Sequence, residues 1–198
     1  MHMGSQLLKD VTERNGGILK TSDAVAAGVS KPTLAKFVKS NRYERVAHGI
    51  YLAPDAWDDG MYLLQLRFPS ILFSHDTALF LHGLTDQEPL HYTATAKTGY
   101  NPSRLKESGA KVYTVKRELF DLGMTKMETP FGHDIRTYDL ERTVCDVVRS
   151  RSSMESAVLY DALKQYVKCK DKNLHRLMEY AKALRVERIL RQYLEVLL

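Results

Sequence analysis

Hydrophobic residues near the start of the chain recur at helical spacing. Leu7, Leu8 and Val11 lie on one face of a helix predicted over residues 6–15, which the glycine pair at 16–17 ends. After an extended link at residues 18–19, a second short helix is expected. The chain therefore begins with short helices that are separated by breaks, and not with one long helix.

The second helix has a start signal and a stop signal. Thr21 or Ser22 can cap it by accepting a hydrogen bond from a free backbone amide, and its body spans residues 24–27. Gly28 then ends it. The helix is thus only about two turns long.

A third helix is predicted to run to about Ser40. Ser30 is its expected N-cap, and Pro32 lies in the first turn, where the missing N–H costs nothing. The apolar positions at i, i+3 and i+4, which must face the core, are Leu34, Phe37 and Val38. This register turns outward a polar and basic face made of Pro32, Thr33, Lys36, Lys39 and Ser40.

A hairpin follows, because residues 43–52 alternate over two short strands with His48-Gly49 as the tight turn. Two short helices joined by a glycine turn and followed by such a wing are typical of a winged helix-turn-helix domain, whose second helix enters the major groove of DNA. The predicted DNA-binding residues are Ser30, Lys31, Thr33, Lys36, Lys39, Arg42, Arg45 and His48. A merely solvated basic face is the alternative interpretation of the two lysines on the third helix.

Charge along the chain favours the first interpretation. The formal net charge of the 198 residues is +5. Residues 1–52 carry eight basic against four acidic residues, residues 53–152 twelve against fourteen, and residues 153–198 nine against six. An excess of positive charge in residues 1–52 indicates an anionic partner, with nucleic acid as the first candidate.

Composition indicates a globular protein of the cytoplasm. With 44% hydrophobic residues the chain can bury a core, and its longest apolar stretch, residues 71–84, is interrupted by polar residues and too short to span a bilayer. The first residues do not resemble a secretory signal, so we expect a reducing compartment. Cys145 and Cys169 are accordingly interpreted as buried core thiols.

The remainder of the chain is predicted to be a larger α+β domain with a helical C-terminal tail. A proline, three acidic residues and a glycine cluster at residues 54–60, so we expect a winged helix-turn-helix domain at residues 1–53 and a larger α+β domain at 54–198. Its expected strands cover residues 71–73, 90–95, 111–115 and 135–138; its expected helices cover residues 61–67, 77–82, a segment led by Pro102, 139–149 and the chain from 153 onward. Ser74 or Asp76 is the expected cap of the helix at 77–82, and Asp139 caps the helix that follows it.

Candidate chemistry in this second domain has a structural alternative at each position. His75, His82, His91 and His133 lack the i, i+4 spacing with a neighbouring carboxylate that zinc hydrolases use, so we expect structural histidines and no metal. Arg142 and Asp146 are four residues apart and predict an ion pair within one helix; a functional surface is the alternative.

Motifs of three enzyme classes are absent from the sequence. There is no acid-x-Lys triplet of a restriction-type nuclease on a plausible strand, no Gly-Ser followed by the paired carboxylates of a nucleotidyltransferase, and no phosphate-binding P-loop. We therefore expect no catalytic residues and no cofactor. Three apolar stripes in the C-terminal helices are interpreted as core, with a basic opposite face that is either solvated or in contact with an anionic partner.

Several segments resemble one bacterial family. In the head these are Gly16-Gly17-Ile18, Gly28-Val29-Ser30 with Thr33-Leu34, and Arg45-Val46-Ala47-His48-Gly49-Ile50-Tyr51. In the second domain they are Phe73-Ser74-His75-Asp76-Thr77-Ala78-Leu79 with His82-Gly83-Leu84, and Tyr138-Asp139-Leu140-Glu141-Arg142-Thr143-Val144-Cys145-Asp146. This pattern, which covers most of residues 6–150, resembles the AbiEi family of antitoxins.

The resemblance implies an antitoxin of a toxin-antitoxin and phage abortive-infection operon that also represses its own promoter. The implied partners are double-stranded DNA, with inverted repeats in the promoter, and a nucleotidyltransferase-like toxin that is countered without a stable complex, as in type IV systems. Because no dimerising helix is visible, we expect a monomer in solution. The alternative is a DNA-binding regulator whose C-terminal domain is a protein-docking module or an unrecognised enzyme.

Overall fold

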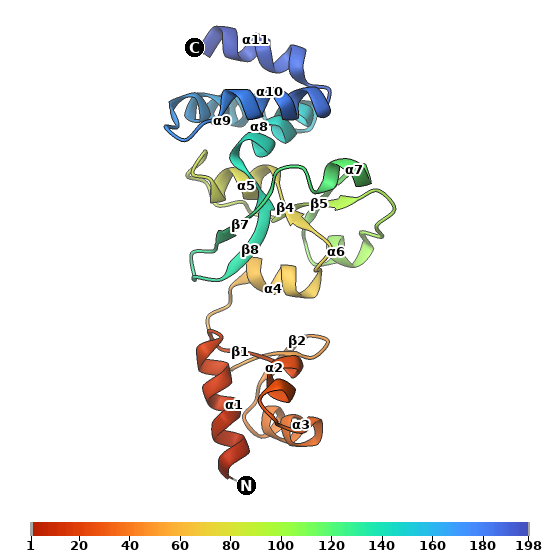
Figure 1. Ribbon diagram of the computed structural model, residues 1–198, viewed down its shortest axis with the longest axis vertical. Coiled ribbons are helices and arrows are strands. Elements are labelled where there is room, and N and C mark those ends of the chain that lie inside the picture. Colours follow the sequence, from red (N-terminus) through yellow and green to blue (C-terminus); the bar gives the residue numbers. More distant parts are fainter. Residues whose placement is uncertain (1, 198) are drawn as a thin grey trace. The chain divides into compact units, whose positions relative to one another are not determined.

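The computed structural model describes residues 2–197 and divides them into two compact units, with the chain passing from one to the other between Arg67 and Phe68 (Figure 1). The sequence places the boundary after residue 53, whereas the first unit also includes helix α4 (Gly60–Arg67). Tyr62 of α4 contacts the first unit directly, since its OH lies 3.2 Å from Lys20 Nζ of β1, and Asp59 Oδ1 accepts a hydrogen bond from the Tyr62 amide at the start of the helix.

The first unit is the winged helix-turn-helix predicted from the sequence. Its other elements are α1 (His2–Arg14), β1 (Ile18–Lys20), α2 (Thr21–Ala26), α3 (Lys31–Ser40), β2 (Glu44–Ala47) and β3 (Ile50–Leu52). The strands form an antiparallel sheet in the order β1-β3-β2. The expected link at residues 18–19 is therefore a strand, because β3 offers its backbone a hydrogen-bonding edge.

The apolar stripes of α1 and α3 meet in the core of this unit, as the helical spacing predicts. The buried side chains are Leu8, Val11, Leu19, Ala24, Val29, Leu34, Phe37 and Val38. Burying each large side chain contributes about 1.5–3 kcal/mol, so these contacts fix which side of α3 remains exposed.

The two short helices begin differently. Ser30 caps α3 as predicted, because its Oγ accepts a hydrogen bond from the Thr33 amide at 3.4 Å. The predicted cap of α2 is wrong, since Lys20 occupies the N-cap position and makes no side-chain cap hydrogen bond. The Thr21 amide instead donates to the carbonyl of Gly49 in the hairpin at 2.7 Å, so a tertiary contact replaces the cap.

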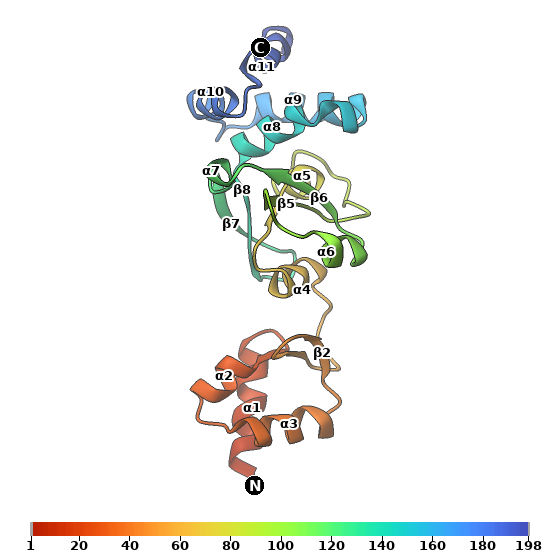
Figure 2. The same ribbon diagram turned by 90° about the vertical axis from the view of Figure 1, so that its right-hand side faces the viewer.

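The second unit is the expected α+β domain with a helical tail (Figures 1 and 2). Its elements are β4 (Leu72–Phe73), α5 (His75–Leu81), β5 (Thr93–Lys97), α6 (Ser103–Glu107), β6 (Lys111–Val115), α7 (Arg117–Phe120), β7 (Met124–Glu128), β8 (Asp134–Tyr138), α8 (Leu140–Arg149), a 3₁₀ turn (Arg151–Ser153), α9 (Ser156–Lys168), α10 (Leu174–Ala183) and α11 (Glu187–Leu197). One mixed sheet has the order β6-β5-β4-β8-β7, with parallel pairs β5-β6 and β4-β8.

Two elements of this unit are missed by the sequence analysis, and one cap is wrong. Strand β7 pairs with β8 along its whole length, although its own sequence carries little apolar signal. The short helix α7 is likewise unpredicted. Helix α5 begins at His75, so Asp76 lies inside its first turn, and Ser74 occupies the N-cap position without a cap hydrogen bond.

Helices α9, α10 and α11 gather around α8, as both views show (Figures 1 and 2). Leu163, Leu177 and Leu190, one from each tail helix, are fully buried in the same core, which confirms the apolar stripes. Cys145 belongs to this core as expected, but Cys169 is only partly buried because it lies beyond the last turn of α9.

Helix α8 carries a buried ion pair that joins it to a neighbouring loop. Asp139 caps the helix as predicted, and Arg142 Nε donates to Asp146 Oδ2 at 3.1 Å, which confirms the pairing within one helix. Arg142 Nη1 donates to the backbone carbonyls of Leu119 and Leu122, at 2.7 Å each. The guanidinium thereby links α8 to α7, which contains Leu119, and to the loop between α7 and β7, which contains Leu122.

We predict that Gly123→Ala is markedly destabilising. Gly123 has φ +75°, and an added β-carbon would lie 2.6 Å from Arg142 Cβ. Gly109→Ala is the matched control, because Gly109 has φ +86° and no atom within 4 Å of an added β-carbon. Both variants strain the backbone by about 1–2 kcal/mol, and Gly123→Ala should lose about 1–3 kcal/mol more through overpacking. Urea unfolding measures the free energy of unfolding of both variants. Equal losses of this free energy would contradict the close packing of Gly123 against Arg142.

Candidate nucleic-acid interface

The outer face of α3 is polar, basic and exposed. Lys31, Thr33, Lys36 and Lys39 are all exposed, whereas Leu34, Phe37 and Val38 on the other side are buried. The helix therefore presents three ammonium groups on the side that the sequence register turns outward. Such a face can lie in a major groove, with lysines on phosphates and polar side chains near base edges.

The turn before α3 sets how its first residues are presented. Gly28 has φ +85°, and the Val29 amide donates to the Ala24 carbonyl at 2.9 Å, which closes α2 with a glycine in the left-handed region. Ser30 then begins α3, and its Oγ lies 2.8 Å from Thr33 Oγ1. Ser30 and Thr33 are thus exposed polar groups at the N-terminus of a helix, where backbone amides favour an anion.

The wing brings two of the predicted residues together. Arg45 Nη2 lies 3.0 Å from His48 Nδ1, and Arg45 Nε donates to the Ala47 carbonyl. A register shift between Arg45 and Ala47 marks a bulge in β2. Both side chains are exposed at the tip of the hairpin, so the structure groups Arg45 with His48.

Arg42 stands apart from both groups. It follows the end of α3 with φ +58°, a left-handed conformation that usually favours glycine or asparagine. Its amide donates to the Lys39 carbonyl at 3.4 Å, and its side chain is exposed. The eight predicted residues therefore form a helix group, a wing group and one residue between them.

The start of α1 is a neighbour of α3 that the sequence analysis missed. Helix α1 begins at His2, well before the predicted start at residue 6. A β-carbon on Gly4 would lie 3.8 Å from Thr33 Cγ2. Met3 lies four residues before Leu7 and is an apolar signal for this earlier start, but Gly4 and Ser5 between them are weaker helix formers than alanine.

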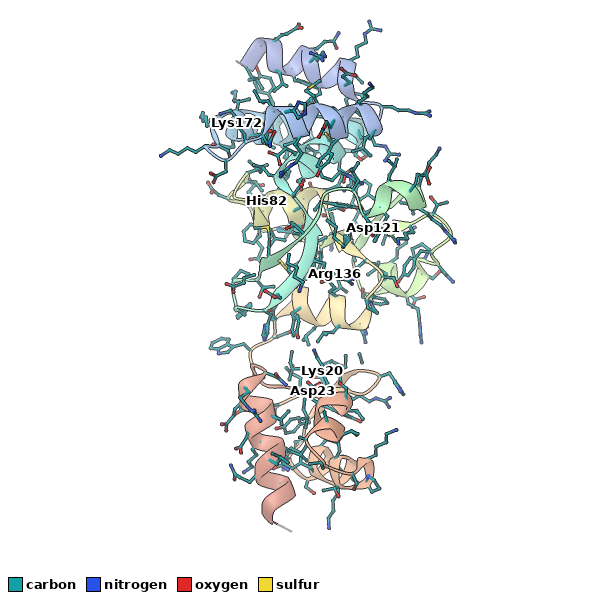
Figure 3. All side chains as sticks on the ribbon, in the orientation of Figure 1. Lys20, Asp23, His82, Asp121, Arg136 and Lys172 are labelled. Atoms are coloured by element: carbon teal, nitrogen blue, oxygen red, sulfur yellow. The ribbon has the colours of Figure 1, made fainter. Side chains whose placement is uncertain are left out.

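Not every basic residue of this unit is available to a ligand. Lys20 Nζ lies 3.2 Å from Tyr62 OH and 5.6 Å from the centre of that ring. Lys20 is accordingly occupied by packing within the unit. The acidic Asp23 is also engaged within the unit, since its Oδ2 accepts a hydrogen bond from Asn15 at 3.3 Å and its Oδ1 accepts one from Ser22 (Figure 3).

His75 and His82 are packed as structural groups, as expected, whereas His91 is exposed and is not a core histidine. His75 is 3% exposed; its Nδ1 lies 2.9 Å from Ser74 Oγ and its Nε2 2.9 Å from Ser150 Oγ. Its ring stacks on Tyr113 with centroids 3.5 Å apart. His82 Nε2 donates to the Tyr138 carbonyl at 2.7 Å (Figure 3). These contacts explain why the segments that resemble the family contain these histidines.

Metal ligation has no geometric support in the part of the chain that the structure describes. Among residues 2–197, no three His, Cys, Asp or Glu side chains converge as a cation site would require. Glu141, within the resembling segment at residues 138–146, instead accepts hydrogen bonds from the Asn173 amide and the Tyr166 hydroxyl. It therefore holds α10 against α8.

The comparisons with known proteins bear most directly on the winged helix-turn-helix domain. Residues 6–54 match the family described as "Transcriptional regulator, AbiEi antitoxin", which confirms the resemblance for this domain. A crystal structure of the RV2827C protein from Mycobacterium tuberculosis has a similar fold, with a TM-score of 0.63 and 13% identity over 90% of this chain and 71% of that one. No curated protein sequence matches the chain. Within residues 2–197, none of the helices combines the length and apolar character needed to span a bilayer.

We predict that His75 makes stability depend on pH. Burial lowers the pKa of His75 from 6.5 to about 3, so below pH 6.5 the unfolded chain binds a proton that the folded chain does not. The free energy of unfolding should therefore fall by up to about 1.4 kcal/mol per pH unit between pH 6.5 and 3 from this residue. His75→Asn, which tolerates the observed φ of +48°, should remove this contribution.

Urea unfolding of both proteins at pH 7.5, 6.5, 5.5 and 5.0 is the measurement, with exposed His91→Asn as the control for losing an imidazole. The informative quantity is the slope against pH, since His75→Asn also loses the stacking contact and is less stable at every pH. A variant that keeps the wild-type slope would show that His75 titrates normally in the folded protein.

Proposed function

We propose that this chain is an antitoxin of a bacterial toxin-antitoxin operon and represses its own promoter by binding DNA through the first unit. The second unit counters a nucleotidyltransferase-like toxin, in a type IV manner that needs no stable complex, and the operon acts in abortive infection by phage. The chain acts in the cytoplasm as a monomer, one protomer to each inverted repeat. It needs no cofactor and catalyses no reaction.

The observation that carries DNA binding is the division of α3 into a buried side and a basic side. The family match over residues 6–54 supports a transcriptional regulator at the same place. In helix-turn-helix proteins the second helix of the motif enters the major groove, and α3 holds that position here, after α2 and the turn at Gly28.

We assign each group of side chains a role by its place on the unit. Ser30, Lys31 and Thr33 lie at the N-terminus of α3, where free amides and the helix dipole favour a phosphate. Lys36 and Lys39 contact phosphates along the groove, and Thr33 is close enough to the helix N-terminus to reach base edges. Arg45 and His48 place the wing on the flanking backbone or minor groove, and Arg42 contacts a phosphate between the two.

The proposal that the second unit is not an enzyme rests on how its polar side chains are used. The imidazole nitrogens of His75 both lie within hydrogen-bond distance of hydroxyl groups, and Arg142 is occupied by Asp146 and two backbone carbonyls. General acid-base or nucleophilic catalysis requires such groups to reach a substrate. Their burial favours a structural role in holding the surface that opposes the toxin.

We predict that Lys36→Ala combined with Lys39→Ala weakens binding to promoter DNA without unfolding the protein. Both side chains are exposed, so truncation should leave the melting temperature within about 2 °C, as surface changes usually do. If each lysine contacts one phosphate, the slope of log K against log salt should fall by about 1.8 in total. The matched control is Lys168→Ala with Lys170→Ala, which removes the same charge from exposed positions near the end of α9.

Gel-shift titrations over a range of salt concentrations, on DNA from upstream of the chain's own gene, provide the measurement. The double variant on α3 should bind more weakly and lose salt dependence, while the control should bind like the wild type. Equal losses of DNA affinity in both variants would show that the lysines of α3 act only through the net charge of the protein. Unchanged affinity in both variants would show that α3 does not contact the DNA.

A further inference from the structure

One long segment of this basic chain contains no basic side chain except histidine. No lysine or arginine occurs between Arg67 and Lys97, although the whole chain has 29 of them. The same interval contains Asp76, Asp86 and Glu88. The segment is therefore negatively charged in a protein whose net charge is +5.

The structure places this segment along an open cleft of the second unit. The cleft has a volume of about 650 Å³ and is lined by α5, the loop after it, the start of β6 and the start of α9. Its apolar wall includes Leu90, Met154 and Val158. Leu90 is 96% exposed, so a large apolar side chain projects from the loop at the edge of the cleft.

A second cleft of similar volume continues the first. The two share Thr85, Gln87, Glu155 and Val158 as lining residues. The second cleft extends along α9 to Asp161 and Gln165. Together they form one groove, here called the acidic groove, with Leu90, Met154 and Val158 as its apolar wall and Glu88, Glu155 and Asp161 on its rim.

The carboxylates of this groove other than Asp76 have no ion-pair partner within residues 2–197. Among the residues that the structure describes, no ion pair involves Asp86, Glu88, Glu155 or Asp161, and all four are exposed. The basic groups that line the groove are Lys111 and His91, both on its first half. Lys164, one turn from Asp161, lies over the ring of Tyr160 instead and lines neither cleft.

Asp76 adds to the negative charge from inside the groove. It is about half-buried, and burial raises the pKa of its carboxyl group above its usual range. Lys111, which lines the same groove, favours the charged form of Asp76, so this carboxylate already has a cationic neighbour and the rim carboxylates are those left for a ligand. The groove thus combines an apolar wall with carboxylates both inside it and on its rim.

We infer that the acidic groove binds a basic segment of a partner protein, whose lysine or arginine side chains pair with Glu88, Glu155 and Asp161 while an apolar side chain packs against Leu90 and Val158. This site lies outside the predicted DNA interface and does not depend on it. Arginine suits it best, because a guanidinium pairs with a carboxylate and stacks on apolar surface at the same time.

Other occupants fit the groove less well. Nucleic acid would be repelled by the carboxylates, since its backbone carries negative charge at every step. A cation alone has no converging set of three ligands among residues 2–197. Charge complementarity together with the exposed leucine therefore favours a basic, partly apolar peptide.

The test uses the full chain and a fluorescein-labelled synthetic peptide rich in Lys, Arg and Leu, with a matched peptide in which Glu replaces every Lys and Arg. Fluorescence anisotropy measures the dissociation constants at low and physiological salt. The basic peptide should bind and the acidic peptide should not. Binding should weaken as salt rises, because exposed charges are screened.

Variants locate the site. Glu155→Gln with Asp161→Asn should raise the dissociation constant by about 2- to 25-fold, since each exposed ion pair contributes about 1.4- to 5-fold. Leu90→Ser, which leaves the charge unchanged, should raise it by several fold through lost apolar contact. The control, Asp171→Asn with Glu195→Gln, removes the same charge at exposed positions outside the groove and should change binding by less than about twofold.

Each other outcome overturns the inference. Equal weakening in the control variant would show long-range attraction without a site, and no preference for the basic peptide would remove the partner class. Sedimentation that shows a dimer lost in Glu155→Gln with Asp161→Asn would assign the groove to a second copy of this chain. Promoter binding by the same variants should match the wild type, so a failure here is distinguishable from a failure of the proposed DNA binding.

Discussion

Burial of the Arg142 guanidinium is the constraint on which the second unit depends. Its side chain is fully buried, lies 4.0 Å above the centre of the Tyr138 ring, pairs with Asp146 and donates to the carbonyls of Leu119 in α7 and Leu122 in the loop after it. Removing one partner of such a pair costs about 3–5 kcal/mol, because an unpaired charge remains in the interior. The close approach of Gly123 to Arg142 and the capping of α8 by Asp139 follow from the same requirement. Asp139, Arg142 and Asp146, in the resembling segment at residues 138–146, are thus parts of one buried polar network.

In the first unit, the core leaves charged side chains exposed instead of burying them. There the core takes one side of α3 and leaves the other, with Lys36 and Lys39, free of contacts that would compete with a ligand. The wing adds Arg45 and His48 on the hairpin of β2 and β3, which is held against β1 through β3. The two units thus use charge differently: the second buries it to hold helices and strands together, and the first exposes it for an anionic partner.

Local sequence was sufficient for features whose causes lie within one turn of helix or one hairpin. The Ser30 cap, the Asp139 cap and the pairing of Arg142 with Asp146 are of this kind, and all three are present. Features that depend on distant residues were missed or wrong. The start of α2 is satisfied by Gly49, β7 is held by β8, and Ser74 turns to Thr95 and His75 instead of capping α5. The acidic groove is of the same kind, since it joins residues 76–91 to the start of α9, which no local pattern connects.

The central claim, that α3 lies against promoter DNA, is tested most directly by cleavage from a reagent attached to that helix. Ala35 is exposed on α3, so Ala35→Cys in a Cys169→Ser background, with Cys145 buried, gives one site for an iron-EDTA label. The account predicts cuts on both strands within one short stretch of the DNA upstream of the gene, and weaker cutting at the same positions when Lys36→Ala and Lys39→Ala are added. Cuts that are scattered along the DNA, or that are unchanged by these two substitutions, would contradict it.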